Sequence, residues 1–470
     1  MAQRRGRRLR RNIGILGNFA FGYADVAEGI YFTLGLVVFY AGAAATFAYL
    51  FATVAYVLTA LCYAELASLY HQAGGAFVYA RRAFGPNVAF FAAWALLLDY
   101  VVTTAISALA AMGYLGYFVP QLNSPLLIGL ATAAATALLM GLNIFGISES
   151  AKFSYFLVLF NLAGMATVLV TGYLFSFRPG LNPIHFGTSP TYPNFLYAVT
   201  IAMSSYLGIE VISQSAGETR RPAKNIPRAV FLISSATVAA SLSFSTLAVG
   251  VRNVQDFQSS INDPVAFIAL ALPNGWILAG LASFLGISVL LVAANAGIVG
   301  ASRITYAMSQ DGVIPRVFGR LHKKYNTPFV SIIILSSISV AIGFSGKLEV
   351  AAQLYNFGAL LAYVIVGLSL ISLRNTDRAL FRPFKTPGSI TIRPFWRRTR
   401  NAIPAEHYSI PIIGVLCVIA DLTVWLLVVI LHPLGRVFGS LWMGVGLLVF
   451  FAYTRIRKSE GPAPETVPGS

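Results

Sequence analysis

Twelve long apolar stretches limit what this chain can fold into more than any other feature of its sequence. A bilayer core about 30 Å thick requires about 20 mostly apolar residues in each helix that crosses it. The stretches of this kind lie near residues 13–38, 43–69, 88–118, 125–146, 153–175, 194–216, 229–250, 275–305, 329–345, 350–373, 410–431 and 437–455. They predict an all-α integral membrane protein with 12 transmembrane helices.

The positive charge of the chain is concentrated in alternate loops. Charged residues make up only 10% of the chain, against about 25% in a soluble domain, and the net charge is +17. Of the 33 Lys and Arg residues, 29 lie on one predicted side, which leaves Arg178, Arg252, Lys347 and Arg436 for the other. The positive-inside rule therefore predicts a multi-pass protein of the cell (plasma or inner) membrane with both termini in the cytoplasm. Basic loops beside a lipid bilayer explain this charge, and no nucleic-acid partner is expected.

The sequence lacks the patterns that metal sites and nucleophilic enzymes require. Its five histidines and two cysteines form no pair at metal-ligand spacing. We therefore expect no metal, no cofactor and no enzyme activity. Cys62 and Cys417 are more than 300 residues apart, so no disulfide is expected and both are interpreted as ordinary lipid- or core-facing residues. There is no ATP-binding P-loop, so accumulation of a substrate would depend on an ion gradient or on exchange.

Two of the apolar stretches are interrupted by glycines and polar residues. The first contains Asp25 and Glu28, and the sixth contains Ser-Ser-Tyr-Leu-Gly-Ile-Glu at 204–210. An acidic residue at the centre of a membrane helix costs about 2.5–3.5 kcal/mol on insertion scales. Paired interruptions five spans apart are typical of an inverted repeat whose two broken helices meet at a central site. The alternative for each interruption is a kink that lets neighbouring helices pack closely.

Three longer motifs lie at the ends of the second, sixth and eighth stretches and continue into the loops that follow. They are Ala64-Glu65-Leu66 with 74–85, 206–210 with 217–229, and 301–315. These motifs resemble the amino acid/polyamine/organocation transporter superfamily, and the resemblance runs from about residue 13 to residue 456. It implies a leucine-transporter-type 5+5 inverted repeat with broken helices 1 and 6. A small amine or amino acid would bind at the breaks and cross the membrane by alternating access.

The resemblance also implies a division of the chain. We expect a basic cytoplasmic tail at 1–12, a transport core at 13–373 with repeats at about 13–175 and 194–373, a basic cytoplasmic loop at 374–409, spans 11 and 12 at 410–456, and a cytoplasmic tail at 457–470.

The expected substrate-binding residues lie at the two breaks, where half-helix ends and freed backbone groups can bind charged groups. They are Tyr23, Asp25, Ala27, Glu28, Gly29, Ser204, Ser205, Tyr206 and Gly208. Tyr206 is expected to offer an aromatic face to an ammonium group. The superfamily usually has a Gly-small-Gly triplet at 27–29, which brings bare backbone to a substrate carboxylate. Glu28 would repel that carboxylate, so it favours a cationic amine or polyamine, or a proton-carrying role for Glu28.

The coupling ion is predicted less directly. Candidates are Asp25, Glu28, Asp99, Asn161 and Asn295. Proton-driven relatives often carry a lysine midway along span five, where this chain has Asn161. Span eight lacks the neighbouring hydroxyls of sodium-coupled relatives, although Asn295 could coordinate sodium. Coupling to H+ or exchange is therefore expected. A structural hydrogen bond explains Asp99 equally well, and Asp421 is expected in packing or an oligomer contact.

Several charged residues at predicted cytoplasmic helix ends are candidates for an inner gate. They are Glu65, Arg81, Glu210, Glu218 and Arg303. Pairs between these carboxylates and arginines such as Arg228 would close that side, and an ordinary loop brace is the alternative.

The sequence thus predicts a secondary active transporter, or permease, for amino acids or related amines and polyamines. A passive channel would instead show repeated filter-like segments around a pore. The stretch Tyr23-Ala-Asp-Val also faintly resembles potassium uptake permeases of the same fold, so uptake of an inorganic cation is the alternative function.

Overall fold

The computed structural model describes residues 13–72, 74–146, 151–187, 190–217, 219–392 and 408–459. Within these ranges, ten stretches are helical, long and apolar enough to cross a membrane. One of them, Ile15–Leu69, has 55 residues and is long enough for two crossings, whereas the apolar helix Phe329–Gly343 is shorter than the rest. The prediction of a helical membrane protein is confirmed. Twelve spans and the inverted repeat stay predictions.

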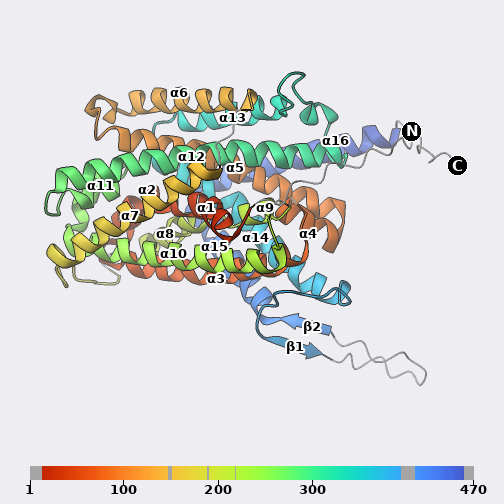
Figure 1. Ribbon diagram of the computed structural model, residues 1–470, viewed down its shortest axis with the longest axis horizontal. Helices are drawn as coiled ribbons and strands as arrows, with labels where there is room; N and C mark the ends of the chain where they lie inside the picture. The colour runs from red at the N-terminus through yellow and green to blue at the C-terminus, as the bar shows by residue number, and fades with distance from the viewer. Residues whose placement is uncertain are drawn as a thin grey trace.

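The helices run mainly along the long axis of the molecule (Figure 1). The α-helices are α1 (Ile15–Ala27), α2 (Gly29–Ala41), α3 (Ala45–Leu69), α4 (Gly75–Phe84), α5 (Pro86–Leu115), α6 (Pro125–Ile144), α7 (Ala151–Phe175), α8 (Tyr192–Met203), α9 (Val211–Ser215), α10 (Pro222–Val251), α11 (Pro264–Ala269), α12 (Gly275–Gln310), α13 (Phe329–Gly343), α14 (Leu348–Thr376), α15 (Ile412–Leu431) and α16 (Pro433–Ser459). Short 3-10 helices lie between them at η1 (Gly42–Ala44), η2 (Pro120–Asn123), η3 (Ser204–Tyr206), η4 (Val254–Ser260) and η5 (Arg316–Gly319).

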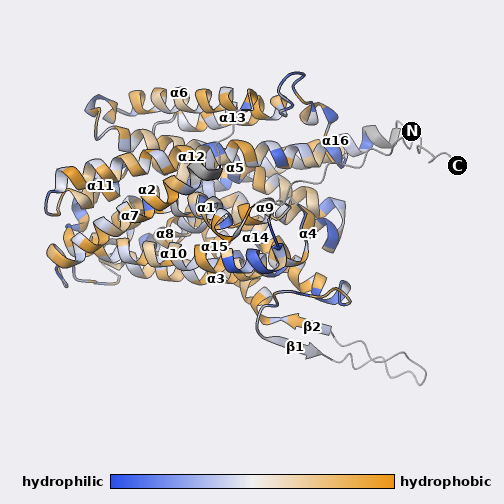
Figure 2. Ribbon diagram, viewed as in Figure 1, coloured by the Kyte–Doolittle hydropathy of each residue, from blue (hydrophilic) through white to orange (hydrophobic). Residues whose placement is uncertain are grey.

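The helix α5 lies at the centre of the bundle. Its most apolar window is buried completely, and α5 packs against both α12 and α14. The helices α6, α15 and α16 lie at the periphery and expose large apolar side chains such as Leu138, Ile430 and Leu448. Figure 2 shows apolar residues along the outer helices and polar residues in the loops at their ends. An apolar surface of this extent is suited to contact with lipid.

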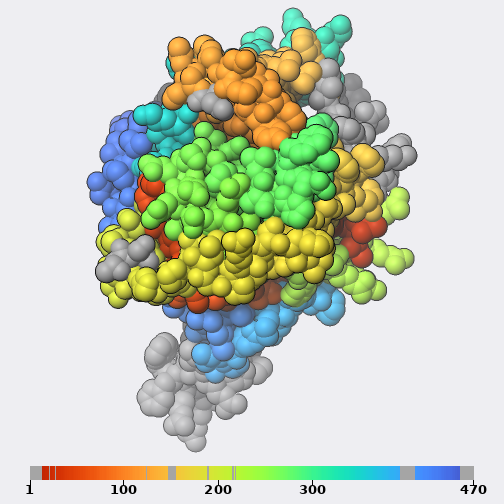
Figure 3. All heavy atoms as spheres, turned by 90° about the vertical axis from the view of Figure 1, so that its left-hand side faces the viewer, coloured from red at the N-terminus to blue at the C-terminus, as the bar shows by residue number. Residues whose placement is uncertain are grey.

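The two ends of the bundle carry different elements. The end on the right of Figure 1 carries α4 and the C-terminal ends of α12 and α14, and we call it the α4 end. The opposite end carries α11 and is called the α11 end. Figure 3 views the α11 end, where the yellow and green segments between α7 and α12 cover most of the surface.

A two-stranded antiparallel sheet extends from the α4 end. Strand β1 (Ser389–Ile392) pairs with β2 (Tyr408–Pro411), so that Ser389 lies opposite Pro411 and Ile392 lies opposite Tyr408. The sequence predictions treat 374–409 as a loop because of its charge and lack this sheet. The β-branched run Ile390-Thr391-Ile392 favours a strand locally, and this short signal is easily missed beside the basic residues that follow it.

Candidate substrate site at two interrupted helices

Both interrupted stretches of the sequence are interrupted in the structure. The helix α1 ends at Ala27 and α2 begins at Gly29, with Glu28 at the junction. The second interruption is longer, because α8 ends at Met203 and α9 begins only at Val211, with η3 between them. The positions of both breaks therefore agree with the sequence prediction.

The two interruptions lie against each other. A Cβ atom added to Gly29 would meet backbone atoms of Ser205, and one added to Gly208 would lie 2.6 Å from Asp25 Oδ2. The hydroxyl of Thr33, one turn further along α2, is hydrogen-bonded to the Ser205 hydroxyl. Small residues thus let the two backbones approach closely, as they do at membrane helix interfaces.

Gly208 is required at its position by its backbone conformation as well as by space. Its φ angle is +103°, in the region that side chains other than glycine rarely adopt. Its N–H donates to the Tyr363 hydroxyl at 3.3 Å. This turn directs the chain from η3 past Asp25 and into α9.

Four of the sixteen carboxylates of the chain gather at this crossing. Asp25, Glu28, Asp99 and Glu210 come from α1, the junction after it, α5 and the turn before α9, and none is more than 7% exposed. They are close enough to interact electrostatically with one another. We call these four residues the acidic cluster.

The acidic cluster lacks a positive partner in the described part of the chain. No Lys or Arg nitrogen there lies within 4.0 Å of any of the four carboxylates. Both oxygens of Glu28, Oδ1 of Asp99 and Oε1 of Glu210 also have no hydrogen-bond partner among those residues. A buried carboxylate that is neither paired nor hydrogen-bonded is strongly unfavourable. The cluster is therefore suited to take up positive charge, as protons or as a bound cation.

Three tyrosines that the sequence predictions omit lie around the acidic cluster. The Tyr363 hydroxyl donates to Glu210 Oε2 at 2.6 Å and accepts the bond from Gly208. Tyr355, also on α14, and Tyr100 on α5 lie within electrostatic reach of the carboxylates. Tyr355 and Tyr363 are eight residues apart, a spacing that puts two side chains near the same face of a helix. That spacing within an apolar stretch is the signal that could have identified them.

Two predicted tyrosines make their contacts with other helices. The ring of Tyr206 stacks on Tyr56 of α3 with centroids 4.9 Å apart, and its hydroxyl lies 2.8 Å from Thr53 Oγ1. One face of Tyr206 is therefore covered, and its hydroxyl is engaged by α3. The Tyr23 hydroxyl donates to the sulfur of Met165 on α7 at 3.7 Å.

Three further predicted residues, Ser204, Asn161 and Asn295, differ in their hydrogen bonding. Ser204 is buried, and its hydroxyl has no hydrogen-bond partner among the described residues. The amide of Asn161 donates to the Tyr31 hydroxyl at 2.8 Å, which joins α7 to α2. Asn295 instead accepts from Asn143 of α6 at 2.6 Å. Its side chain is therefore engaged outside the interrupted helices.

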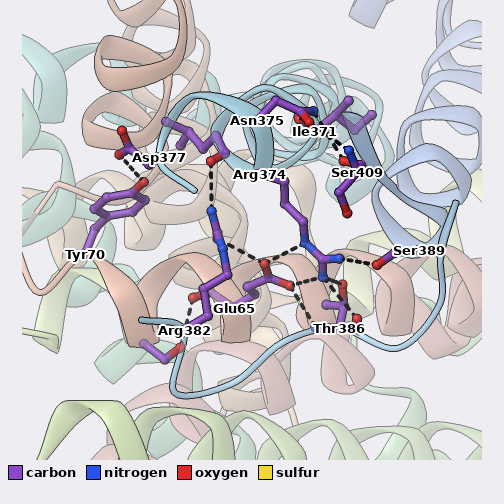
Figure 4. Close-up of polar contacts among 12 residues, drawn as sticks. Glu65, Tyr70, Ile371, Arg374, Asn375, Asp377, Arg382, Thr386, Ser389 and Ser409 are labelled. Carbon is purple, nitrogen blue, oxygen red and sulfur yellow. Dashed lines mark hydrogen bonds and ion pairs between the residues drawn. The ribbon is translucent and has the colours of Figure 1, made fainter. Parts of the chain in front are cut away.

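Glu65, a gate candidate, forms the centre of a buried ionic cluster at the α4 end (Figure 4). Its Oε1 accepts from Arg374 Nε at 2.9 Å and from Arg382 Nη1 at 3.1 Å. Its Oε2 accepts from Arg374 Nη2 at 2.6 Å and from the Thr386 N–H at 2.7 Å. The Arg374 guanidinium also donates to the Ser389 hydroxyl of β1 at 2.7 Å. This cluster ties α3 to the end of α14 and to the segment that leads into the sheet.

The other gate candidates do not pair with one another among the described residues. Arg81 of α4 pairs with Asp311, which follows α12. Glu210 belongs to the acidic cluster. Arg303 makes no ion pair among the described residues, and Glu218 lies outside those residues.

A second ionic contact lies beside Glu65. Asp377 accepts from Arg82 Nε and from the Tyr70 hydroxyl, both at 2.6 Å. Partial burial alone would raise the pKa of Asp377, but these hydrogen bonds outweigh it and hold the pKa below its ordinary value.

Asp421 and the two cysteines come together between α15 and α3. Thr59 Oγ1 donates to Asp421 Oδ2 at 2.7 Å, and Cys417 Sγ donates to the same oxygen at 3.2 Å. Cys62 lies close enough to interact with Cys417. Both thiols are free and buried. Asp421 thus holds α15 against α3, in agreement with the packing role expected for it, and the cysteines are neighbours despite their separation in sequence.

The sequence of the chain is similar to those of known membrane transporters. The chain matches the amino acid permease family over residues 13–451. It is 29% identical over 420 residues to the low-affinity putrescine importer PlaP of Escherichia coli, a match that covers 85% of this chain and 83% of the relative. It is 24% identical over 405 residues to the branched-chain amino acid permease BcaP of Bacillus subtilis, covering 82% and 80%. It is 27% identical over 331 residues to the human cystine/glutamate transporter, covering 67% and 64%.

Proposed function

Because this chain belongs to the amino acid permease family, we propose that it is a secondary active transporter that moves small amine cations or amino acids across the cell membrane by alternating access. The acidic cluster is the observation that carries the preference for an amine cation. A zwitterionic amino acid would bring its own carboxylate among four buried carboxylates, whereas an ammonium group supplies the positive charge that they lack.

The relatives support a substrate of this class. One is named as a putrescine importer and another as a branched-chain amino acid permease, so related chains act on both amines and amino acids. A linear diamine carries two ammonium groups, and two such groups can pair with two members of the acidic cluster. We therefore propose a linear diamine or a similar amine as the preferred substrate.

The crossing of the two breaks is proposed to be the binding site. An ammonium group would contact Glu28 and Asp25, while carbonyl groups released between Ser204 and Glu210 would accept its remaining hydrogen bonds. The Tyr363 hydroxyl would hold Glu210 in place. Alternating access would follow from tilting of the half-helices at Glu28 and at Gly208, because the helical hydrogen-bond ladder is already interrupted there.

The carboxylates of the acidic cluster also suggest how transport is coupled to a second ion or to exchange. When a cationic substrate leaves, the carboxylates that it neutralised would again be buried without positive partners. Protons or a second substrate molecule would have to replace it, which supports H+ coupling or exchange.

The proposed orientation rests on the distribution of charge. The loops that hold 29 of the 33 Lys and Arg residues include those at the α4 end. The positive-inside rule then places this end and both termini in the cytoplasm and the α11 end outside.

Uptake into liposomes that contain the purified protein tests the proposed function. We expect saturable uptake of labelled putrescine that increases when the outside is acidified, and weak competition by leucine. Uptake of leucine without uptake of putrescine would contradict the preference for a cation. Putrescine-independent uptake of labelled potassium would favour the inorganic cation alternative instead.

A further inference from the structure

A cavity of about 510 Å³ lies at the α4 end, apart from the interrupted helices. Its walls come from the ends of α6 and α12, the start of α13 and the loop between α12 and α13. None of its lining residues belongs to α1, α2, α8 or α9. The cavity is therefore separate from the proposed substrate site.

The lining of this cavity is rich in unused hydrogen-bond donors. Arg303, Tyr306 and Asn326 all line it, and none of the three side chains makes a hydrogen bond or an ion pair with another described residue. Arg303 and Tyr306 are three residues apart on α12, so they share a helix face. None of the described residues that line the cavity is a carboxylate.

The wall opposite α12 is fixed by its own hydrogen bonds. The His322 N–H donates to Thr327 O at 2.8 Å, and the Asn326 N–H donates to His322 O at 3.0 Å. The Thr327 hydroxyl donates to Ile144 O at 2.7 Å, which joins this loop to the end of α6. Asn326 is held with a positive φ of 55°. The cavity is therefore formed by an ordered loop between two helices.

We propose that this cavity binds a phosphate group. A guanidinium, a hydroxyl and an amide can donate several hydrogen bonds to phosphate oxygens, and Arg is suited to this through its planar fork of donors. Lys323 and Lys324 lie in the same loop and add positive charge nearby. The site is opposite in charge to the acidic cluster, so the two sites would select different ligands.

Two sources could supply the phosphate. The helices α6 and α13 expose apolar side chains such as Leu138 and Ile333, so the headgroup of an anionic phospholipid could reach the cavity from the bilayer. A free phosphate compound could reach it from the aqueous side. Both would place the same chemical group against Arg303.

Binding measured by thermal stabilisation of the purified protein in detergent distinguishes these sources. The probes are inorganic phosphate, phosphatidylglycerol and, as the zwitterionic comparison, phosphatidylcholine. We expect saturable stabilisation by a phosphate-bearing anion. Stabilisation by phosphatidylglycerol well below the concentration needed for inorganic phosphate identifies the lipid as the source, and the reverse order identifies a free phosphate.

Three variants test the assignment of the residues. Arg303→Gln should weaken the affinity about tenfold, the size expected for one charge-assisted hydrogen bond. Tyr306→Phe keeps the ring and should weaken it less, which preserves the test if Arg303→Gln does not fold. Arg378→Gln removes an exposed arginine beside the sheet and should leave the affinity unchanged. The proposal is overturned if neither anion stabilises the protein, if phosphatidylcholine acts equally, or if both cavity variants bind like the unmodified chain.

Discussion

At the scale of single residues, Gly208 links the shape of one break to the charge of the other. Its φ of +103° lets the chain turn between η3 and α9, and its missing side chain leaves room for Asp25. A side chain here would both strain the backbone and displace a member of the acidic cluster. A substitution at Gly208 therefore alters the geometry of the proposed site without changing a charge.

We predict that Gly208→Ala reduces amine uptake strongly while the protein still folds. The left-handed conformation should cost about 1–2 kcal/mol of stability, and the new Cβ would lie 2.6 Å from Asp25 Oδ2 unless one of them moves. Uptake rate and melting temperature are the measurements. Gly444→Ala is the control, because an added Cβ there meets nothing within 4 Å. Normal uptake by Gly208→Ala would show that the crossing is not the site.

Asp263 provides a prediction that depends on pH. It precedes α11 outside the spanning helices, and burial raises its pKa from 3.8 to about 6. The unfolded chain ionises this group at lower pH than the folded chain, so stability falls as the pH rises from about 4 to about 6 and stays lower above that range.

Above about pH 7, Asp263→Asn should therefore increase the free energy of unfolding by at most about 3 kcal/mol and raise the melting temperature accordingly. Below about pH 4 it should leave both unchanged. Asp256→Asn, at an exposed position in η4, is the control. The same effect of Asp263→Asn at both pH values would contradict this explanation.

At the scale of elements, the sequence predicts the positions of the two breaks because their cause is local. Glycines and carboxylates within an apolar stretch interrupt a membrane helix wherever the stretch is packed. The direction in which side chains point at a break is determined by helices that are distant in sequence. That Tyr206 faces the substrate stays a prediction, and the structure adds that one face of its ring stacks on Tyr56, about 150 residues earlier in the chain.

The contacts of Glu65 illustrate what cannot be predicted from spacing. Its partners Arg374 and Arg382 lie 309 and 317 residues away, and the sequence offers many other arginines on the same predicted side. Only the packing of α3 against α14 selects these two. The same reason explains why Tyr355 and Tyr363 were missed, since a tyrosine in an apolar stretch becomes part of a site only through the helices around it.

The ionic cluster of Glu65 should contribute more to stability than the exposed pairs at the same end. Glu65→Gln leaves Arg374 buried without its counter-charge, and this should cost about 3–5 kcal/mol. Asp311→Asn removes the Arg81–Asp311 pair, whose side chains are 46% and 32% exposed, and should cost no more than about 1 kcal/mol. Melting temperatures of the two variants are compared. Equal losses would contradict a special role for Glu65.

At the scale of the whole molecule, an apolar bundle separates two ends of different charge. The basic residues of the loops at the α4 end face one side of the membrane, and the sparsely charged loops at the α11 end face the other. The acidic cluster lies between them in the buried interior. A cation that crosses this molecule would therefore pass a group of four buried carboxylates that have no positive partner among the described residues.

Labelling of single introduced cysteines tests the proposed orientation. Ser259 at the α11 end and Lys323 at the α4 end are both exposed, while the native Cys62 and Cys417 are buried. Thr188, a further position in a loop predicted to be external, lies outside the described residues. An impermeant thiol reagent added outside intact cells should label Ser259→Cys and spare Lys323→Cys. The opposite pattern would reverse the topology.

The affinity of the purified protein for labelled putrescine, before and after Glu28→Gln, tests the central claim most directly. The substitution keeps the shape of the side chain and removes one charge from the acidic cluster. We predict at least an approximately tenfold loss of affinity, the size of one charge-assisted contact, at mildly acidic and mildly alkaline pH alike. Asp421→Asn removes an equally buried carboxylate outside the cluster and should change the affinity little. Unchanged affinity in Glu28→Gln, or an equal loss in Asp421→Asn, would contradict binding of the cation by the acidic cluster.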